Sequence, residues 1–250
     1  MAEKLTPLHD PGNGIMRIAG LMSGSGTNLR KIIENALHYR VVVIFSDNID
    51  SNALKIGKEY DLPVVVRDKK GFYKKRGKPL RDMEVREEFD SETVKALSVY
   101  DCPVAAYAGY MSIASPVLVN AFLGVNVHPA DLSIVNGLGR RKYTGDHAVL
   151  DALVSGEREI RSSTHLITNQ VDGGQILMIS SPVLINPDDL KTAPNYDTAN
   201  RYQDKLKEIG DWVVFPRTLE DIACGRFSKD ARGNLYYGNE MIPFGLRLAG

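Results

Sequence analysis

Short apolar runs alternate with amphipathic stretches along the first third of the chain. Residues 16–21, 41–45 and 64–66 are apolar almost throughout, which is typical of strands buried on both faces of a parallel sheet. Between these runs, apolar residues recur at helical spacing over 29–37, and a second helical stretch covers about 52–60. The pattern predicts a β-α-β-α-β unit by residue 66, with helices on both faces of the sheet.

The rest of the chain continues the alternation and then changes to an antiparallel pattern. Two runs, 163–168 and 175–180, are joined by a turn with Asp-Gly-Gly at 172–174 and predict an antiparallel hairpin; 235–239 predicts another. The fold class is therefore α/β: a Rossmann-like, mostly parallel sheet with helices on both faces and an antiparallel C-terminal hairpin. The other predicted elements are strands at 104–108 and 124–128 and helices over about 83–100, near 115–116, over 146–155 and over about 197–224.

Two segments do not follow this alternation of strands and helices. Residues 67–82 contain eight lysines and arginines against two aspartates, with two glycines and a proline, and we expect a basic surface loop. Residues 1–15 are polar, with prolines and glycines, and we expect a flexible N-terminal extension. Because no change of composition marks a later boundary, residues 16–250 are predicted to form a single domain.

Composition narrows the class of protein. With 43% hydrophobic and 25% charged residues the chain is an ordinary globular protein. Its 31 Lys and Arg equal its 31 Asp and Glu, so a global attraction to nucleic acid or to an anionic membrane has no basis. The two cysteines lack the spacing of zinc ligands or of a redox motif. We therefore expect a cytoplasmic protein with no metal, no nucleic-acid partner and no membrane partner.

A glycine-rich loop, Ser-Gly-Ser-Gly-Thr-Asn at 23–28, separates the first predicted strand from the first predicted helix. Small residues at this position let backbone N–H groups and the helix N-terminus bind an anion such as a phosphate. The loop lacks the third glycine of the dinucleotide fingerprint and the Gly-Lys-Ser/Thr of a P-loop. A tight turn with an asparagine or threonine cap explains it equally well, and Asp47 at the end of the second strand keeps nicotinamide binding open.

Two polar side chains end the strand predicted at 124–128. Asn126 and His128 stand two residues apart, so they project to the same side of the strand, at the sheet edge where α/β proteins bind ligands. An amide and an imidazole there can stabilise an oxyanion, and the histidine can also exchange a proton. Taken alone, a capping asparagine and a structural histidine explain this motif more simply, and a hairpin turn explains Asp172. The remaining histidines have no metal-ligand spacing and are expected at the surface or in the core, with His147 beside the pocket: His9, His38, His147 and His165.

Taken in order, these motifs resemble the folate-dependent formyltransferase family. The resemblance rests on the order and spacing of the segments, covers residues from about 16 to 185, and extends more loosely to the end of the chain. The segments that carry it are Ser-Gly-x-Gly-Thr-Asn-Leu at 23–29, Phe-Ser-Asp at 45–47, the stretch 108–116, Asn-x-His-Pro at 126–129, Tyr-Thr-Gly at 143–145, and 164–177 with its Asp-Gly-Gly turn.

The resemblance implies formyl transfer from the co-substrate 10-formyltetrahydrofolate to an amine. It is nearest to the family members that act on glycinamide ribonucleotide in purine synthesis. Asn126, His128 and Asp172 would form the catalytic group, in which Asp172 favours a protonated His128 and orders a water. The substrate phosphate would be held by Gly26, Thr27 and Asn28. The folate would contact Met111, Ser112, Ile113, Ala114 and Asn126.

Some positions depart from the family pattern. Ser112 stands where the family usually has arginine, Ser162 stands where it usually has glycine, and the loop 134–142 is longer than expected. The basic segment near 70–82 is an insertion, which we expect to steer an anionic tail such as folate polyglutamate. Alternatives therefore stay open: a formyltetrahydrofolate hydrolase, a sugar-nucleotide N-formyltransferase or, from a different class, a nucleotide-binding module without catalysis. A homodimer also stays open.

Overall fold

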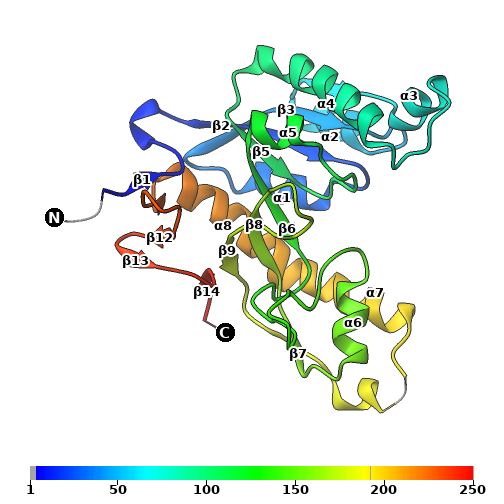
Figure 1. Cartoon of the computed structure of the whole chain (residues 1–250), viewed down its shortest axis with the longest axis vertical. Coiled ribbons are helices and arrows are strands. Elements are labelled where there is room, and N and C mark those ends of the chain that lie inside the picture. Colours follow the sequence, from blue (N-terminus) through cyan, green and yellow to red (C-terminus); the bar gives the residue numbers. More distant parts are fainter. Residues whose placement is uncertain (1–3, 192, 250) are drawn as a thin grey trace. The chain divides into compact units, whose positions relative to one another are not determined.

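The computed structural model describes residues 4–191 and 193–249, which group into two compact units. The N-terminal unit comprises residues 11–126 and 167–169, and the C-terminal unit comprises the remaining described residues. Figure 1 colours the chain from its blue N-terminus to its red C-terminus and labels the elements of both units. The single domain predicted from residue 16 onward stays a prediction.

A parallel sheet forms the centre of the N-terminal unit. Its strand order is β6-β5-β2-β3-β4, and every neighbouring pair runs parallel. Ile18, Leu21, Val43 and Phe45 are fully buried, which explains why these strands are apolar on both faces. The parallel sheet predicted from the sequence is confirmed. The strands are β2 (Met16–Met22), β3 (Tyr39–Ser46), β4 (Val64–Val66), β5 (Val104–Tyr107) and β6 (Leu123–His128), whose last two residues belong to the C-terminal unit.

Helices alternate with these strands as the periodicity predicts. The side chain of Asp82 caps α4 by accepting a hydrogen bond from the backbone N–H of Val85 at 3.2 Å, and α4 lies beside α5 (Figure 1). The helices of this unit are α1 (Thr27–Glu34), α2 (Ala53–Tyr60), α3 (Lys69–Lys75), α4 (Met83–Leu97) and α5 (Pro116–Ala121), with short 3₁₀ turns η1 (Pro11–Asn13) and η2 (Ser98–Tyr100).

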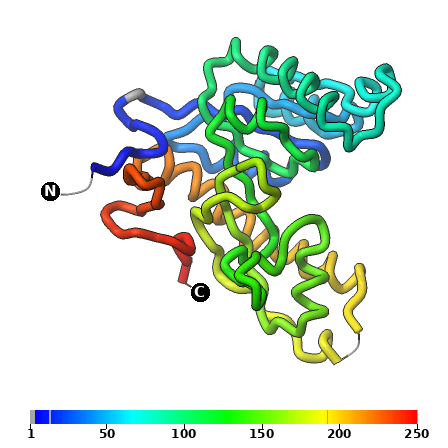
Figure 2. Tube along the Cα trace, in the orientation of Figure 1, coloured from blue at the N-terminus to red at the C-terminus, as the bar shows by residue number. Residues whose placement is uncertain are grey.

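The surface loop predicted over 67–82 is wrong for its first half, because residues 69–75 form helix α3. The side chain of Asp68 caps this helix by accepting a hydrogen bond from the N–H of Gly71 at 2.9 Å. Tyr73 is buried, and the ring of Phe72 packs edge-on against Phe89 of α4, with 5.2 Å between the ring centroids. Figure 2 shows the chain turning back from α3 into α4. The basic segment therefore begins as a helix because its two aromatic residues are covered by α4.

The C-terminal unit contains the predicted antiparallel hairpin. β8 (Ser163–Leu166) pairs antiparallel with β9 (Ile176–Ile179), and β14 (Leu246–Arg247) adds parallel to β9. An apolar cluster that includes Leu153, Ile160, Tyr202 and Leu206 joins α6 (Ala148–Val154) to α7 (Tyr196–Leu206). The smaller sheets are β1-β11-β12-β13, made of Thr6–Pro7, Phe227–Lys229, Leu235–Tyr237 and Glu240–Met241, and β7-β10, made of Glu159–Ile160 and Val183–Leu184. The α/β class with an antiparallel C-terminal part is confirmed.

Two segments of this unit differ from the expectation. Thr6 and Pro7, in the predicted flexible extension, form strand β1 and pair antiparallel with β11. The single helix predicted over 197–224 is divided into α7, a π-helical turn (Lys207–Asp211) and α8 (Trp212–Ala223). Pro216 lacks the N–H that would bond to the carbonyl of Trp212, and its ring crowds that carbonyl, which accounts for the irregular turn just before α8.

Across the described residues, no helix combines the length and the apolar character needed to cross a membrane.

Candidate functional site

The glycine-rich loop lies between β2 and α1 with the helix N-terminus directly behind it. Gly26 is the N-cap residue of α1 and has a left-handed φ of 73°. A Cβ at this position would lie 2.4 Å from the Ile56 side chain, so only glycine fits. No side chain caps α1. The alternative explanation of the loop, a tight turn with an asparagine or threonine cap, is therefore not what the structure shows. Thr27 and Asn28 are partly exposed at the first turn of α1, and the positive end of the helix dipole at this position favours an anion.

Asp47, at the start of the segment that follows β3, is bonded to protein groups on both oxygens. Ser23 Oγ donates to Asp47 Oδ1 at 2.6 Å, while Ser112 Oγ donates to Oδ2. The Lys69 ammonium lies 3.0 Å from Oδ2, and the carboxylate is buried. A carboxylate engaged in this way is not available to the ribose hydroxyls that a nicotinamide cofactor would offer. Asp47 therefore no longer supports the alternative that the protein is a nucleotide-binding module.

Helix α4 holds both ends of the loop 111–114. Arg86 and Asp90, 3% and 0% exposed, form an ion pair with Nη2 and Oδ1 2.6 Å apart. Arg86 Nη2 also donates to Tyr110 Oη at 2.6 Å, and the N–H of Ser115 donates to Asp90 Oδ2 at 2.8 Å. Burial opposes the charge on Arg86, but Tyr110 and Asp90 outweigh it and raise the pKa of the guanidinium. The Arg86 guanidinium therefore stays charged, and the pair fixes the residues on either side of the loop.

The loop 111–114 itself presents apolar side chains to solvent. Met111 is 67% and Ile113 is 62% exposed, although the backbone N–H of Met111 is fixed by a 3.0 Å hydrogen bond to Ser23 Oγ. Ser112 is held by Asp47 and by Lys69. Exposed apolar side chains on a fixed loop are typical of a surface that a ligand covers. The predicted folate-contacting residues 111–114 thus form one ordered element.

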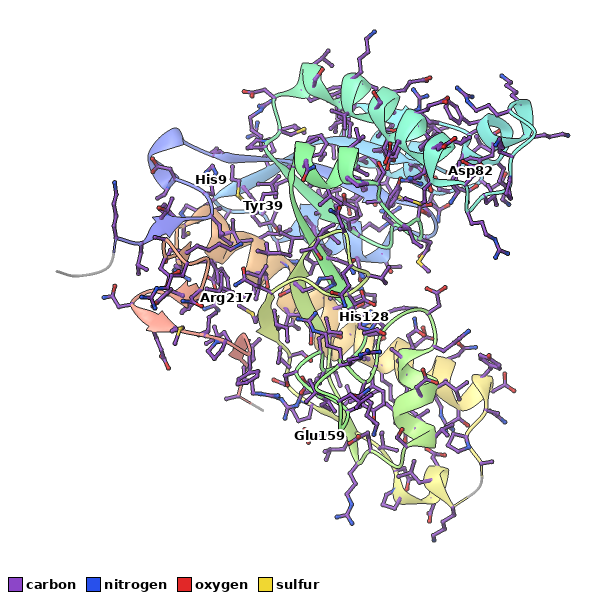
Figure 3. The ribbon with its side chains drawn as sticks, in the orientation of Figure 1. His9, Tyr39, Asp82, His128, Glu159 and Arg217 are labelled. Carbon is purple, nitrogen blue, oxygen red and sulfur yellow. The ribbon has the colours of Figure 1, made fainter. Side chains whose placement is uncertain are left out.

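The C-terminal unit brings His128 and Asp172 together. His128 lies at the end of β6 (Figure 3), 5% exposed, with Nδ1 3.5 Å from Asp172 Oδ2. The same carboxylate oxygen accepts a 2.8 Å hydrogen bond from the N–H of Gly145, and His165 Nε2 lies 3.5 Å from Oδ1. Asp172 itself is 8% exposed and has a left-handed φ of 49°, as a hairpin-turn aspartate does. One carboxylate is thus placed between two buried imidazoles.

The protonation of this pair differs from the expectation. Burial would raise the pKa of Asp172, but the hydrogen bond from His165, the charge of His128 and the N–H of Gly145 lower it to about 2. Burial lowers the pKa of His128, and this effect exceeds the opposing effects of Asp172 and the Tyr143 carbonyl. Asp172 does favour the imidazolium, but burial has the larger effect: in the substrate-free protein at pH 7 the carboxylate is charged and the imidazole is neutral.

The proton of the neutral imidazole is assigned by its neighbours. His128 Nε2 lies 3.0 Å from the backbone oxygen of Tyr143. Because a carbonyl oxygen can only accept, Nε2 carries the hydrogen. The Asp172 oxygen at 3.5 Å from Nδ1 is farther away than in an ordinary hydrogen bond. Nδ1 is therefore the ring atom that can take up a proton, and the nearby carboxylate stabilises the cation that results.

The structure places the third predicted catalytic residue, Asn126, in the N-terminal unit. It is partly exposed and lies opposite Tyr107 in the parallel pairing of β5 with β6. Its predicted role beside His128 and Asp172 stays a prediction. His147, expected beside the pocket, is exposed, and its ring packs against Tyr196 with 5.7 Å between centroids.

The sequence reasoning missed two residues of the Asp172 group. His165 was expected to be an ordinary core or surface residue, although its place on a strand next to the Asp-Gly-Gly turn is a signal that it faces the aspartate. Arg141 gave no such signal. It belongs to the long loop 134–142, which an isolated bridge between Val135 and Arg141 closes into a hairpin-like turn. Arg141 donates to the backbone oxygens of Asp172 and Gly174, the latter at 2.6 Å, so the loop 134–142 fixes the turn that carries Asp172.

Comparisons with known proteins find relatives of this chain in sequence and in fold. The family model described as formyl transferase matches residues 16–214. Phosphoribosylglycinamide formyltransferase of Escherichia coli (strain K12) is 29% identical over 236 residues, covering 92% of this chain and 98% of that protein. The trifunctional purine biosynthetic protein adenosine-3 of Drosophila melanogaster is 29% identical over 217 residues, which are 84% of this chain but 14% of that protein. The solved phosphoribosylglycinamide formyltransferase of Coxiella burnetii has the same fold, with a TM-score of 0.75 at 23% identity over 94% of this chain and 100% of that one.

Proposed function

Because the chain belongs to the formyl transferase family, we propose that it transfers a formyl group from 10-formyltetrahydrofolate to the amine of glycinamide ribonucleotide, a step of purine biosynthesis. The observation that carries the proposal is the neutral, buried His128 beside the ionised Asp172 at the end of β6. The acceptor is inferred from the name of the Escherichia coli relative, which matches this chain over nearly its whole length.

The proposed reaction needs one proton to move between two nitrogen atoms. The amine attacks the formyl carbon, a carbon–nitrogen bond forms, and the formyl oxygen becomes an oxyanion. His128 takes the proton of the amine on Nδ1 and becomes an imidazolium, which Asp172 stabilises by its charge. His128 then returns this proton to the folate nitrogen as its bond to the formyl carbon breaks. The products are a formamide and tetrahydrofolate, and the histidine is neutral again.

Different groups of the protein stabilise the oxyanion and bind each of the two substrates. We assign the oxyanion to the amide of Asn126, a donor of the kind whose removal costs about 3 kcal/mol of transition-state stabilisation. The backbone N–H groups at Gly26, Thr27 and Asn28 would bind the phosphate of the ribonucleotide. The exposed apolar side chains of the loop 111–114 would contact the folate rings.

We extend the proposal to the cellular compartment and to the class of substrate. Cys102 and Cys224 are free thiols, which fits a reducing cytoplasm. The substrates are small molecules. The glycine-rich loop at 23–28 and the pair His128–Asp172 both offer polar atoms suited to them. The homodimer considered above stays a prediction.

The test is the release of tetrahydrofolate from 10-formyltetrahydrofolate, measured with and without glycinamide ribonucleotide. The transferase predicts release only when the amine is present, in equal amount to formylated ribonucleotide. Release without the amine identifies the hydrolase. Transfer to an amino sugar nucleotide but not to the ribonucleotide identifies the third alternative. The His128→Ala protein is the control for background hydrolysis of the donor.

A further inference from the structure

The guanidinium of Arg141 spans the turn that carries Asp172. Its Nη1 donates to the backbone oxygen of Asp172, and its Nη2 donates to the backbone oxygen of Gly174 at 2.6 Å. A guanidinium presents its N–H groups in a rigid planar fork, so it can bond two carbonyls at once, which an ammonium group does less precisely. Burial lowers the pKa of Arg141 and the charge of Asp172 opposes this, but a guanidinium stays protonated at pH 7. Arg141 therefore brings both a two-point contact and a positive charge to the turn.

The backbone of Asp172 needs such a contact. Its φ of 49° lies in the left-handed region, which a residue with a Cβ adopts at a cost. Its carboxylate is 8% exposed, with Oδ2 3.5 Å from His128 Nδ1. A change of φ toward ordinary values would swing the carboxylate away from the imidazole. Because Arg141 bonds the carbonyls on both sides of Gly173, it holds the peptide planes that set this direction.

The segment that follows continues the same support. The backbone oxygen of Tyr143 lies 3.0 Å from His128 Nε2, and the N–H of Gly145 donates to Asp172 Oδ2 at 2.8 Å. Tyr143 is itself fixed, because its hydroxyl donates to Glu157 Oε1 at 2.5 Å. The imidazole and the carboxylate are thus both bonded to a short stretch of chain whose position depends on the loop before it.

The loop 134–142 holds Arg141 in place without a ligand. Asn136 Oδ1 accepts hydrogen bonds from the N–H groups of Leu138 at 2.9 Å and of Arg140 at 3.1 Å. The N–H of Asn136 donates to the backbone oxygen of Arg140 at 2.8 Å. Arg140 is exposed, whereas Arg141 is partly buried against the turn. Two neighbouring arginines therefore have different surroundings, and one can serve as the control for the other.

The charge of Arg141 also acts on His128. Burial lowers the pKa of this imidazole, Asp172 and the Tyr143 carbonyl raise it, and the charges of His165 and Arg141 lower it again. An imidazolium that is too stable would keep its proton instead of returning it to the leaving nitrogen. The carboxylate and the guanidinium thus have opposite effects on the same proton.

We propose that Arg141 is a positioning residue for the proton transfer: its two N–H groups hold the Asp172 carboxylate beside His128 Nδ1, and its charge makes the imidazolium easier to deprotonate. This inference rests on the proposed function, because it takes His128 to carry the proton from the amine to the folate nitrogen. The two contributions are separable. Arg141→Lys keeps the charge and loses the fork, whereas Arg141→Met loses both.

The test measures kcat, KM and the pH profile of kcat/KM. Arg141→Met is expected to lose about 10-fold to 100-fold in kcat, the cost of a misplaced catalytic group, with the KM for the folate within twofold. Its rising limb should lie at higher pH, because an interaction that lowers the pKa of His128 is gone. Arg141→Lys is expected to lose kcat but to keep the limb in place. Arg140→Met, the exposed neighbour, is the matched control and should keep all three quantities.

The outcomes separate this inference from the proposed function. A kcat within twofold of normal in Arg141→Met, or a limb that does not move in it, overturns the inference and leaves the transferase in place. A merely structural role would lower the thermal midpoint and the amount of folded enzyme without moving the limb.

If the unmodified protein transfers no formyl group, the proposed function fails, and ¹⁵N nuclear magnetic resonance of the histidine side chains still tests the inference. The midpoint of His128 is expected to rise in Arg141→Met and to stay unchanged in Arg141→Lys and Arg140→Met. An unchanged midpoint in Arg141→Met overturns the inference.

Discussion

Arg86–Asp90 and His128–Asp172 are both buried pairs of a basic and an acidic side chain, and they differ in what the basic side chain can do. Arg86 Nη2 and Asp90 Oδ1 in the N-terminal unit lie 2.6 Å apart, and the pKa of the guanidinium is raised in spite of its burial. His128 and Asp172 in the C-terminal unit lie 3.5 Å apart, and burial lowers the pKa of the histidine. The difference comes from the cation, because a guanidinium cannot give up its proton near pH 7 whereas an imidazole can. The first pair therefore fixes a loop, and the second is suited to moving a proton.

Among the substitutions that test this difference between the two pairs, we expect the largest effect, a loss of turnover, at His128. His128→Asn keeps a polar side chain of similar size but cannot exchange a proton. We expect kcat to fall by about 10² to 10⁴, the usual value of general acid–base catalysis, with little change in the thermal midpoint. Steady-state kinetics and circular dichroism melting measure the two quantities. A kcat within threefold of the unmodified protein contradicts the role given to this histidine.

The Arg86–Asp90 pair is expected to affect stability first and substrate binding second. Asp90→Asn leaves Arg86 buried without its counter-charge, which should lower the free energy of unfolding by about 3 to 5 kcal/mol. Urea unfolding measures this loss, and Glu87→Gln, an exposed acid on the same helix, should leave stability unchanged.

An apolar double variant separates stability from positioning at this pair. Arg86→Met/Asp90→Leu removes both charges, so it should recover most of the stability. It cannot hold Tyr110 or Ser115, so the KM for the folate should stay several-fold raised while kcat changes less. A normal KM in this variant contradicts the role of the pair in holding the loop 111–114.

Acid should weaken the C-terminal unit through Asp172. Its pKa is about 2 in the folded protein against 3.8 as the ordinary value. A depressed folded pKa gives stability that is present above the ordinary value and is lost as pH falls toward 2. This contribution is roughly 2 kcal/mol. Urea unfolding at pH 6 and pH 2.5 should therefore show a smaller acid loss for Asp172→Asn than for the unmodified protein; equal losses contradict the assigned pKa.

The smallest expected effect is a shift in the pH profile. The account requires a neutral His128 in the free enzyme, so kcat/KM should rise with pH through the pKa of His128, which lies below its ordinary 6.5. Asp172→Asn removes an interaction that raises this pKa, and the rising limb should move to lower pH. Residual activity in that variant, measured from pH 5 to 8, tests the direction. A shift to higher pH would contradict the electrostatic role of the carboxylate.

The sequence was sufficient wherever a short stretch decides its own structure. The apolar runs at 16–21 and 41–45 predicted a parallel sheet because strands buried on both faces cannot be anything but apolar. The glycine-rich loop was predicted from its small residues between a strand and a helix, and the structure shows that Gly26 has a left-handed φ and no room for a Cβ. Spacing alone placed Asn126 and His128 on one side of a strand end, and the resemblance to the family gave them their predicted catalytic roles.

The sequence was insufficient wherever contacts distant along the chain decide the outcome. Helix α3 forms because α4 covers Phe72 and Tyr73, which its short basic sequence does not reveal. Arg141 supports the Asp172 turn through loop geometry that no motif records. The neutral state of the His128 imidazole depends on its burial, which the sequence does not reveal and which outweighs the charge of Asp172.

The central claim is that His128 in the substrate-free protein is a neutral imidazole protonated on Nε2, beside an ionised Asp172. A titration followed by ¹⁵N nuclear magnetic resonance of the histidine side chains, with His128→Asn used to assign the signals, tests it directly. The account predicts the Nε2–H form at pH 7 and a midpoint below 6.5. An imidazolium at pH 7, or a neutral ring protonated on Nδ1, would contradict it.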